Sequence, residues 1–296
     1  MRLWILLILV QQLRCSKLSP SEYESVKRIC GPRLLTSSSK KSFGGRLVKK
    51  GEFPWLVSIY GSAFTCSGVL ISTRHVLTAS HCIIKTSEDS YTEEECKRMG
   101  HKNKRRFFGN VTQFLIVPGN KCPRADLCMR FAVTPTKMFH HEKYDECSSK
   151  HDIAIFEIPN VPPQIALPIC TAGRQTEVSK TLQSAGHGAI GPNSGKSIGY
   201  QVVNITLHEK TATTLITKAD LGVGICSGDS GGPLFQTDSK GRRYTVVGVM
   251  SYGNTCDMHF KKKKRSGSGV SPASDIFTDV AKHSEWICLK TGVCPK

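Results

Sequence analysis

Three short segments of this 296-residue chain carry side chains that together could activate a serine hydroxyl. His81 lies in Thr-Ala-Ser-His-Cys, Asp152 heads an apolar stretch, and Ser230 lies in Gly-Asp-Ser-Gly-Gly-Pro. A serine attacks a carbonyl when a neutral imidazole accepts its proton, and a carboxylate must then fix the imidazole tautomer. Each residue alone is more often structural, but the glycine-rich motif is specific. The three together predict acyl-transfer chemistry.

Short β-strands separated by turns are predicted to position these residues. Apolar runs indicate strands at residues 56–60, 68–71, 114–117, 153–156 and 244–250. Residues 280–287 have apolar side chains at the spacing of one amphipathic helix. We therefore expect an antiparallel all-β protein with a C-terminal helix.

The N-terminus has the pattern of a secretory signal, because Arg2 precedes an apolar run and a short exit segment that ends at Cys15. We expect a signal peptide at residues 1–15 and secretion to the extracellular space. A structural helix there is the weaker alternative, since it would be short and uncapped. Thirteen cysteines suit an oxidising compartment, and no later apolar run is long enough to span a membrane. In a secreted chain, the sequons at Asn110 and Asn204 predict glycosylation.

The chain is strongly basic, with 41 Lys and Arg against 23 Asp and Glu and a net charge of +18. Basic residues gather at residues 97–106 and at Lys261–Arg265. In a secreted protein, such clusters favour polyanions such as glycosaminoglycans, and no nucleic-acid motif accompanies them. Solvated loops without any partner are an equal alternative.

Further motifs of the chain resemble those of the chymotrypsin/trypsin family of serine endopeptidases: Gly44-Gly45, Phe53-Pro54-Trp55, Ser251-Tyr252-Gly253 and Trp286-Ile287. The resemblance covers residues 42–296 and implies a trypsin-like peptidase domain of two six-stranded antiparallel β-barrels, with the triad in the cleft between them. Residues 16–41, which are polar and read as an exposed, cleavable linker, would form a propeptide.

The resemblance also implies a catalytic role for each residue of the motifs. His81 would be the general base, Asp152 the acid that orients it, and Ser230 the nucleophile. The backbone N–H groups of Gly228 and Ser230 would form the oxyanion hole. No metal ion or other cofactor is expected to take part.

Four further positions are implied to support or bind substrate. Ser251 would support the catalytic aspartate, and Gly253 would pair with the substrate backbone as an added strand. The pocket position that is aspartate in trypsin-like members is Gly224 here, whereas Asp275 falls on a pocket wall where glycine is usual. An acid there predicts a basic or mixed preference for the residue before the scissile bond (P1). Alternatively, Asp275 narrows the pocket or turns toward the basic loop at residues 261–265.

Activation in this family implies that a protease cuts after Lys41 and that the new N-terminus, Ser42, pairs with Asp229. Serine is unusual there and buries less apolar surface than isoleucine, by roughly 1–2 kcal/mol. Breaking a buried ion pair costs about 3–5 kcal/mol, so the ammonium group matters more than the side chain. Cleavage after Lys40 is the alternative.

Three disulfides follow from the same resemblance. Cys66–Cys82 would hold the histidine loop, Cys226–Cys256 the specificity pocket, and Cys30–Cys170 the propeptide. The sequence leaves the pairing of the remaining cysteines open: Cys96, Cys122, Cys128, Cys147, Cys288 and Cys294.

The leading interpretation is a secreted serine endopeptidase, made as a zymogen, that hydrolyses protein or peptide substrates through an acyl-enzyme at Ser230. The alternative is a catalytically silent family member that binds a partner or a polyanion. The intact triad argues against this alternative, and Ser42 is the feature in its favour.

Overall fold

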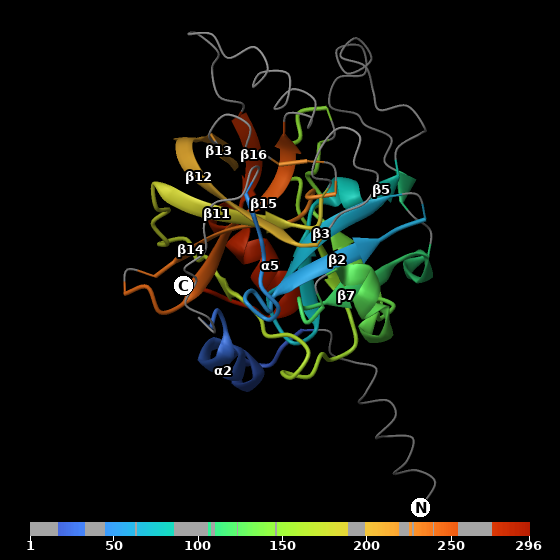
Figure 1. Ribbon diagram of the computed structural model, residues 1–296. Helices are drawn as coiled ribbons and strands as arrows, with labels where there is room; N and C mark the ends of the chain where they lie inside the picture. The colour runs from blue at the N-terminus through green and yellow to red at the C-terminus, as the bar shows by residue number, and fades with distance from the viewer. Residues whose placement is uncertain are drawn as a thin grey trace, which may run out of the picture.

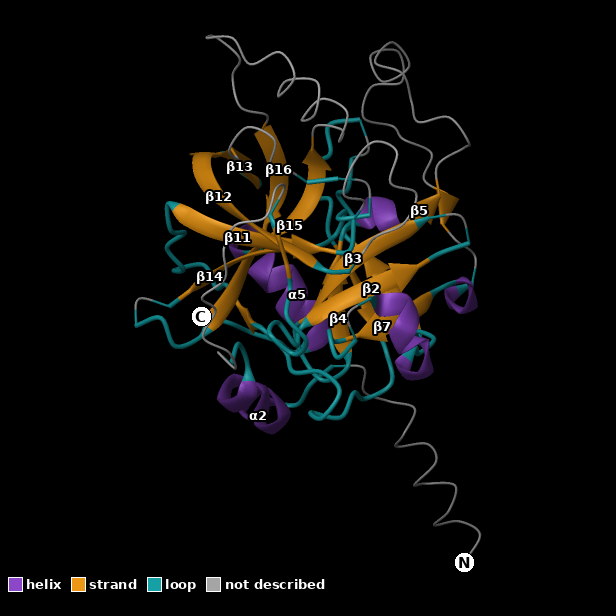
Figure 2. Cartoon of the chain, viewed as in Figure 1, coloured by secondary structure: helices purple, strands orange, loops and turns teal. Residues whose placement is uncertain are grey.

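The computed structural model describes residues 17–32, 45–62, 64–85, 106–107, 110–122, 124–145, 147–188, 199–218, 225–226, 228–238, 240–253 and 274–296. These residues form two β-layers that lie side by side (Figure 1). Figure 2 shows that strands dominate both layers and that the helix α2 (Pro20–Ile29) lies apart from them.

The first layer is a six-stranded antiparallel sheet. Its strands are β2 (Leu56–Tyr60), β3 (Thr65–Leu70), β4 (His75–Thr78), β7 (Leu115–Pro118), β8 (Lys137–His140) and β9 (Ala154–Glu157). They lie in the order β7-β2-β3-β4-β9-β8, which makes a half-barrel. Beside it, β5 (Ile84–Lys85) pairs with β6 (Arg106–Phe107). The first four strands predicted from apolar runs all lie in this sheet.

The second layer closes into a barrel. Its strands are β11 (Thr181–Gly186), β12 (Gln201–Lys210), β13 (Thr214–Lys218), β14 (Pro233–Thr237), β15 (Tyr244–Gly253) and β16 (Ser274–Asp279). The antiparallel ring is complete because β12 pairs with both β11 and β13. Two short strands, β1 (Arg46–Leu47) and β10 (Cys170–Thr171), extend it. The all-β prediction is thus confirmed, with one closed six-stranded barrel and a half-barrel.

Short helical segments connect or end the strands. They are the 3₁₀ turns η1 (Ser80–Cys82), η2 (Val111–Gln113), η3 (Ala125–Phe131) and η4 (Ala281–His283), and the helix α5 (Ser284–Thr291). The predicted C-terminal helix is confirmed as η4 followed by α5, which ends at Gly292 in the left-handed conformation. Within the described ranges, no helix has the length and apolar character needed to cross a bilayer.

The segment before the first strand is folded, where the sequence was interpreted as an exposed linker. Ser19 caps α2, because its hydroxyl accepts the N–H of Glu22 and the Glu22 carboxylate accepts the N–H of Ser19. The Leu18 N–H donates to the Thr291 carbonyl at 2.7 Å, and the disulfide Cys30–Cys170 fixes the far end. This part of the predicted propeptide is therefore docked on the body of the protein.

An aromatic cluster joins the two layers. Phe53 and Trp55, which precede β2, pack on Phe235 of β14, with ring centroids 5.1 and 6.0 Å away. Tyr244 of β15 covers the same cluster. Phe53, Trp55 and Phe235 are buried, so this contact fixes how the two layers face each other.

Candidate active site

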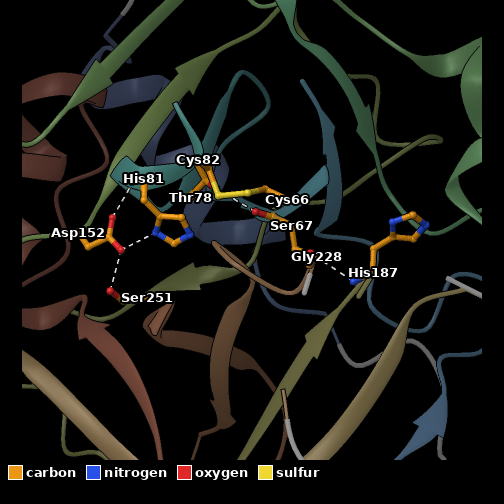
Figure 3. The surroundings of a disulfide bond; sticks show 9 residues. All are labelled: Cys66, Ser67, Thr78, His81, Cys82, Asp152, His187, Gly228 and Ser251. Atoms are coloured by element: carbon orange, nitrogen blue, oxygen red, sulfur yellow. Dashed lines mark hydrogen bonds and ion pairs between the residues drawn. A yellow bond between two sulfur atoms is a disulfide. The ribbon is translucent and has the colours of Figure 1, made fainter. Parts of the chain in front are cut away.

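His81 and Asp152 meet because β4 and β9 are paired. His81 lies in η1 just after β4, and Asp152 lies just before β9. The Asp152 Oδ2 is 2.7 Å from His81 Nδ1, and Oδ1 accepts the backbone N–H of His81 at 3.0 Å (Figure 3). Asp152 is buried, while the His81 side chain is one-third exposed. A carboxylate at this place holds the proton on Nδ1 and leaves Nε2 as the basic nitrogen.

Hydroxyl groups from the second layer hold the acid in place. The Ser251 Oγ donates to Asp152 Oδ2 at 2.7 Å (Figure 3). The Thr278 Oγ1 donates to the Asp152 carbonyl at 2.8 Å. Ser251 therefore lies where the family resemblance predicted it, and the Asp152 carboxylate accepts three hydrogen bonds.

Ser230 approaches the same place from the loop before β14. Its carbonyl accepts the N–H of Ser67 at 2.8 Å, and Gly231 N–H donates to the Met250 carbonyl at 2.8 Å. Gly231 lies against Thr78, the last residue of β4. In such sites the contact between the serine Oγ and the imidazole often tightens only with substrate bound.

The Ser67 hydroxyl ties the nucleophile loop to the barrel. It donates to the Gly228 carbonyl at 2.8 Å and accepts the backbone N–H of His187 at 3.0 Å (Figure 3). This bridge orients the peptide that begins the predicted oxyanion hole. Nothing local to Ser67 in the sequence predicted this role, because its partners Gly228 and His187 are distant along the chain.

Asp229, the predicted partner of the new N-terminus, is enclosed by backbone. Its Oδ1 accepts the N–H of Gly188 at 2.7 Å and its Oδ2 the N–H of Cys226 at 3.0 Å. Burial raises the pKa of Asp229 to about 6, and the two backbone hydrogen bonds oppose that shift. Lys41 and Ser42 lie outside the described residues.

Asp275 is buried between neighbouring strands of the barrel. It lies on β16 opposite Gly253 of β15, and a Cβ added at Gly253 would lie 2.7 Å from its Oδ1. The Thr217 Oγ1 donates to the Asp275 carbonyl at 3.4 Å. The structure thus places this acid directly against the residue predicted to pair with substrate. Gly224 lies outside the described residues.

Four disulfides join described residues. Cys66–Cys82 links β3 to η1 beside His81, and Cys30–Cys170 holds the N-terminal segment, both as the resemblance predicted. Two pairs that the sequence had left open are Cys122–Cys128 and Cys288–Cys294. Cys147 and Cys226 are also disulfide-bonded. Cys96 and Cys256 lie outside the described residues, and so does the predicted Cys226–Cys256 pair.

The predicted surface features fall only partly on described residues. Asn110 and Asn204 are both exposed. The basic cluster at Lys261–Arg265 and all but Arg106 of the cluster at residues 97–106 lie outside the described residues, as does the predicted signal peptide. Glycosylation, polyanion binding and secretion therefore stay predictions.

Two glycines offer a matched test of how tightly the nucleophile loop is packed. Gly231 and Gly51 have similar φ values of +78° and +75°. A Cβ added at Gly231 would lie 2.1 Å from Thr78 Oγ1, whereas a Cβ added at Gly51 would have no neighbouring atom within 4 Å among the described residues. We expect Gly51→Ala to cost about 1–2 kcal/mol of unfolding free energy through its left-handed backbone alone. Gly231→Ala should cost about 2 kcal/mol more, because the loop must move away from β4. Denaturant unfolding measures both, and equal losses would contradict the close packing.

The family resemblance is confirmed by comparison with known proteins. A family model described as the nematode trypsin-6-like family matches residues 1–294. Human transmembrane protease serine 11A is 25% identical over 291 residues, which cover 91% of this chain and 60% of that protein. Phenoloxidase-activating factor 3 of Holotrichia diomphalia is 29% identical over 280 residues, covering 83% and 71%. Mouse mannan-binding lectin serine protease 1 is 25% identical over 285 residues, covering 90% and 37%. The chain thus spans less than two thirds of two of these relatives.

Proposed function

Because the chain belongs to the nematode trypsin-6-like family, we propose that it is a secreted serine endopeptidase, made as a zymogen, that cleaves proteins or peptides through an acyl-enzyme at Ser230. The observation that carries the proposal is the hydrogen-bonded series Ser251–Asp152–His81, with Ser230 anchored beside it. Relatives named as serine proteases support this reading.

The proposed reaction uses each of these groups once per half-reaction. His81 Nε2 takes the proton of Ser230 Oγ as the oxygen attacks the scissile carbonyl, and Asp152 stabilises the imidazolium that forms. The N–H groups of Gly228 and Ser230 receive the oxyanion. His81 then gives its proton to the leaving amine. A water molecule hydrolyses the acyl-enzyme by the same steps and restores Ser230.

The direct test is covalent labelling. The purified protein is exposed to a serine-directed phosphonate before and after limited tryptic cleavage, and mass spectrometry locates the label and the new N-terminus. We expect labelling of Ser230 only when Ser42 has become the N-terminus, and none in Ser230→Ala. A clean cut after Lys41 without labelling would reject the protease and favour the silent, partner-binding alternative.

We propose that activation works by giving Asp229 a cationic partner, the Ser42 ammonium group. In the uncleaved chain, the folded pKa of about 6 lies above the ordinary 3.8 of an aspartate. Because the folded state holds the Asp229 proton more tightly than the unfolded state, this group contributes its full stability below pH 3.8. The contribution is lost as the pH rises through 6 and the carboxyl ionises in the folded state. Ionising Asp229 at pH 7 therefore costs the uncleaved protein about 3 kcal/mol.

Cleavage should remove that cost, because an ammonium group beside the carboxylate lowers its pKa. The comparison is made in a Ser230→Ala background, which prevents autolysis. We expect the free energy of unfolding of the cleaved form, relative to that of the uncleaved form, to increase between pH 4 and pH 7. Denaturant unfolding at the two pH values measures the difference, and Asp229→Asn should abolish it. The same pH dependence in both forms would show that Ser42 does not reach Asp229.

We further propose that Asp275 gives the pocket its basic or mixed P1 preference. Its burial against Gly253 supports this role, because a basic side chain entering there would meet a carboxylate that is shielded from water. We expect Asp275→Asn to lower kcat/KM for substrates with Lys or Arg at P1 by about 100-fold. Substrates with Phe or Ala at P1 should change little, and Glu209→Gln, at an exposed carboxylate, should change neither. A wild-type enzyme that cleaves only after Phe or Ala would refute the assignment.

A further inference from the structure

Three histidines from separate elements converge behind the catalytic acid. His141 follows β8, His151 precedes Asp152, and His283 ends η4. One ring nitrogen of each lies within 4.8 Å of the other two. The His141 and His151 rings stack with centroids 4.7 Å apart, and the His283 ring stands nearly perpendicular to both.

From this geometry we propose that His141, His151 and His283 form a binding site for a zinc-class transition-metal ion. Zinc binds imidazole nitrogen at about 2.0–2.1 Å, so two ligands of a tetrahedral site lie about 3.4 Å apart. The His151 Nδ1 is 3.0 Å from the His283 Nε2. The ligand nitrogens all lie within 4.8 Å of one another, so no pair needs to close by more than about 1.4 Å. Because an ion lies in the plane of each imidazole that binds it, the half-buried His141 ring must also turn out of its stack on His151.

The hydrogen bonds of the cluster suit metal binding. The Nδ1 of His283 lies 2.6 Å from the Asp279 carbonyl, which can only accept, so Nδ1 carries the proton. The Nε2 of His283 then accepts the Nδ1 proton of His151, a hydrogen bond that a metal ion would replace. A backbone carbonyl behind a ligand histidine is the usual means of fixing its tautomer. His151 reaches the metal with Nδ1 when its proton moves to Nε2. His283 is buried, whereas His141 and His151 are half-buried, which leaves a route from solvent.

The charges around the cluster do not oppose a cation strongly. Glu142 lies next to His141, pairs with Lys290 at 2.6 Å and accepts the indole N–H of Trp286 at 2.9 Å. Lys143 and Lys150 lie near the histidines and Asp279 lies beside His283, so both signs of charge are present.

The backbone of His151 is held in an unusual conformation. Its φ is +56°, in the left-handed region that non-glycine residues rarely adopt. The preceding loop is held by an isolated antiparallel β-bridge between the backbones of Asp145 and Lys150. The Asp145 carboxylate also accepts the N–H of Cys147 at 3.1 Å. Strain of this kind persists where the surroundings impose it and is common at ligand sites. A bound ion would join this loop to η4 at the residue next to Asp152.

A second group, Cys66, His81 and Cys82, is also close enough to hold a metal ion. Its cysteines are joined as a disulfide and offer no thiolate, so this group lacks the ligands. Metal binding at the histidine cluster can thus be measured independently of catalysis and of the proposed protease function.

The test is metal binding by the whole protein with any affinity tag removed and metal stripped by chelation. Calorimetry with Zn²⁺ should give one ion per chain, and Co²⁺ should give the intense visible absorption of a tetrahedral site. We expect His141→Gln to weaken Zn²⁺ binding by at least about 100-fold, because it removes a ligand. Loss of a residue that only hydrogen-bonds to a ligand has a smaller effect. The double variant His141→Gln/His151→Gln should abolish the Co²⁺ absorption. His208→Gln, at an exposed histidine outside the cluster, is the matched control and should bind as the wild type.

The variants avoid the buried His283 so that folding is retained, and their metal-free Tm should stay close to that of the wild type. Zn²⁺ should raise the Tm of the wild type and of His208→Gln but not that of the double variant. Binding of equal strength in the wild type and the double variant would place the ion elsewhere, for example on His81, and overturn the assignment. No binding by the wild type would overturn it as well.

Discussion

Replacing Ser230 with alanine is expected to lower kcat of the activated protein by about 10⁶-fold. The hydroxyl is the atom that attacks the substrate, and no neighbour supplies a substitute once it is gone. The fold should be unaffected, because the loop is anchored through the Ser230 carbonyl and the Gly231 N–H, which alanine leaves in place. The residual rate should reflect only the oxyanion hole and substrate binding.

Peptide hydrolysis by equal amounts of cleaved wild type and variant measures this loss, with Tm as the check on folding. Ser179→Ala, at an exposed serine far along the chain from the motif, should retain full activity. Hydrolysis that survives in Ser230→Ala would mean that another group, or a contaminating protease, does the chemistry. A wild type that is itself inactive after a correct cut would favour the silent binding protein.

Asp152→Asn is expected to lower kcat by about 10⁴-fold. The Asp152 carboxylate accepts hydrogen bonds from the His81 backbone, the His81 ring and Ser251, so both oxygens act only as acceptors. An asparagine must turn its NH₂ group toward one of these donors. If that group faces His81 Nδ1, the ring proton moves to Nε2, and the imidazole no longer accepts the proton of Ser230.

Single-turnover kinetics on an ester substrate and on a peptide measure this effect, with Asp126→Asn as the matched control. Asp126 forms an exposed ion pair with Arg124, which solvent screens, so its loss should not change kcat. An Asp152→Asn enzyme with near wild-type kcat would show that the tautomer of His81 does not depend on this carboxylate.

The fold was predictable where the spacing of apolar residues indicates which side chains are buried. Residues 56–60 are almost wholly buried in β2, and their mostly apolar sequence, broken only by Ser58, is typical of a strand covered on both faces. The helix α2 was missed because only Val26 is buried within it and most of its residues are polar. Its position depends on contacts distant in sequence: Glu22 with Arg74, the Lys27 carbonyl with Arg243, and the disulfide of Cys30.

The candidate site divides in the same way. The residues His81, Asp152 and Ser230 were recognisable because each lies in a short motif whose residue types suit one chemistry. Ser67 was not, since its hydroxyl becomes informative only through Gly228, 161 residues away. Likewise, His151 and His283 are 132 residues apart, and nothing local to either suggests a partner.

Residue type and apolar spacing act over a few residues, so the groups of the proposed chemistry, the all-β class and several strand positions were predictable from local patterns. The neighbours of each group depend on contacts between distant parts of the chain. Pairing of β4 with β9 brings His81 to Asp152, and packing of the closed barrel on the first layer brings Ser251 to the acid and Ser230 to β3. The same packing assembles the three histidines. Such contacts depend on strand register and on how the layers close over their shared core, and neither is written in any single stretch of residues.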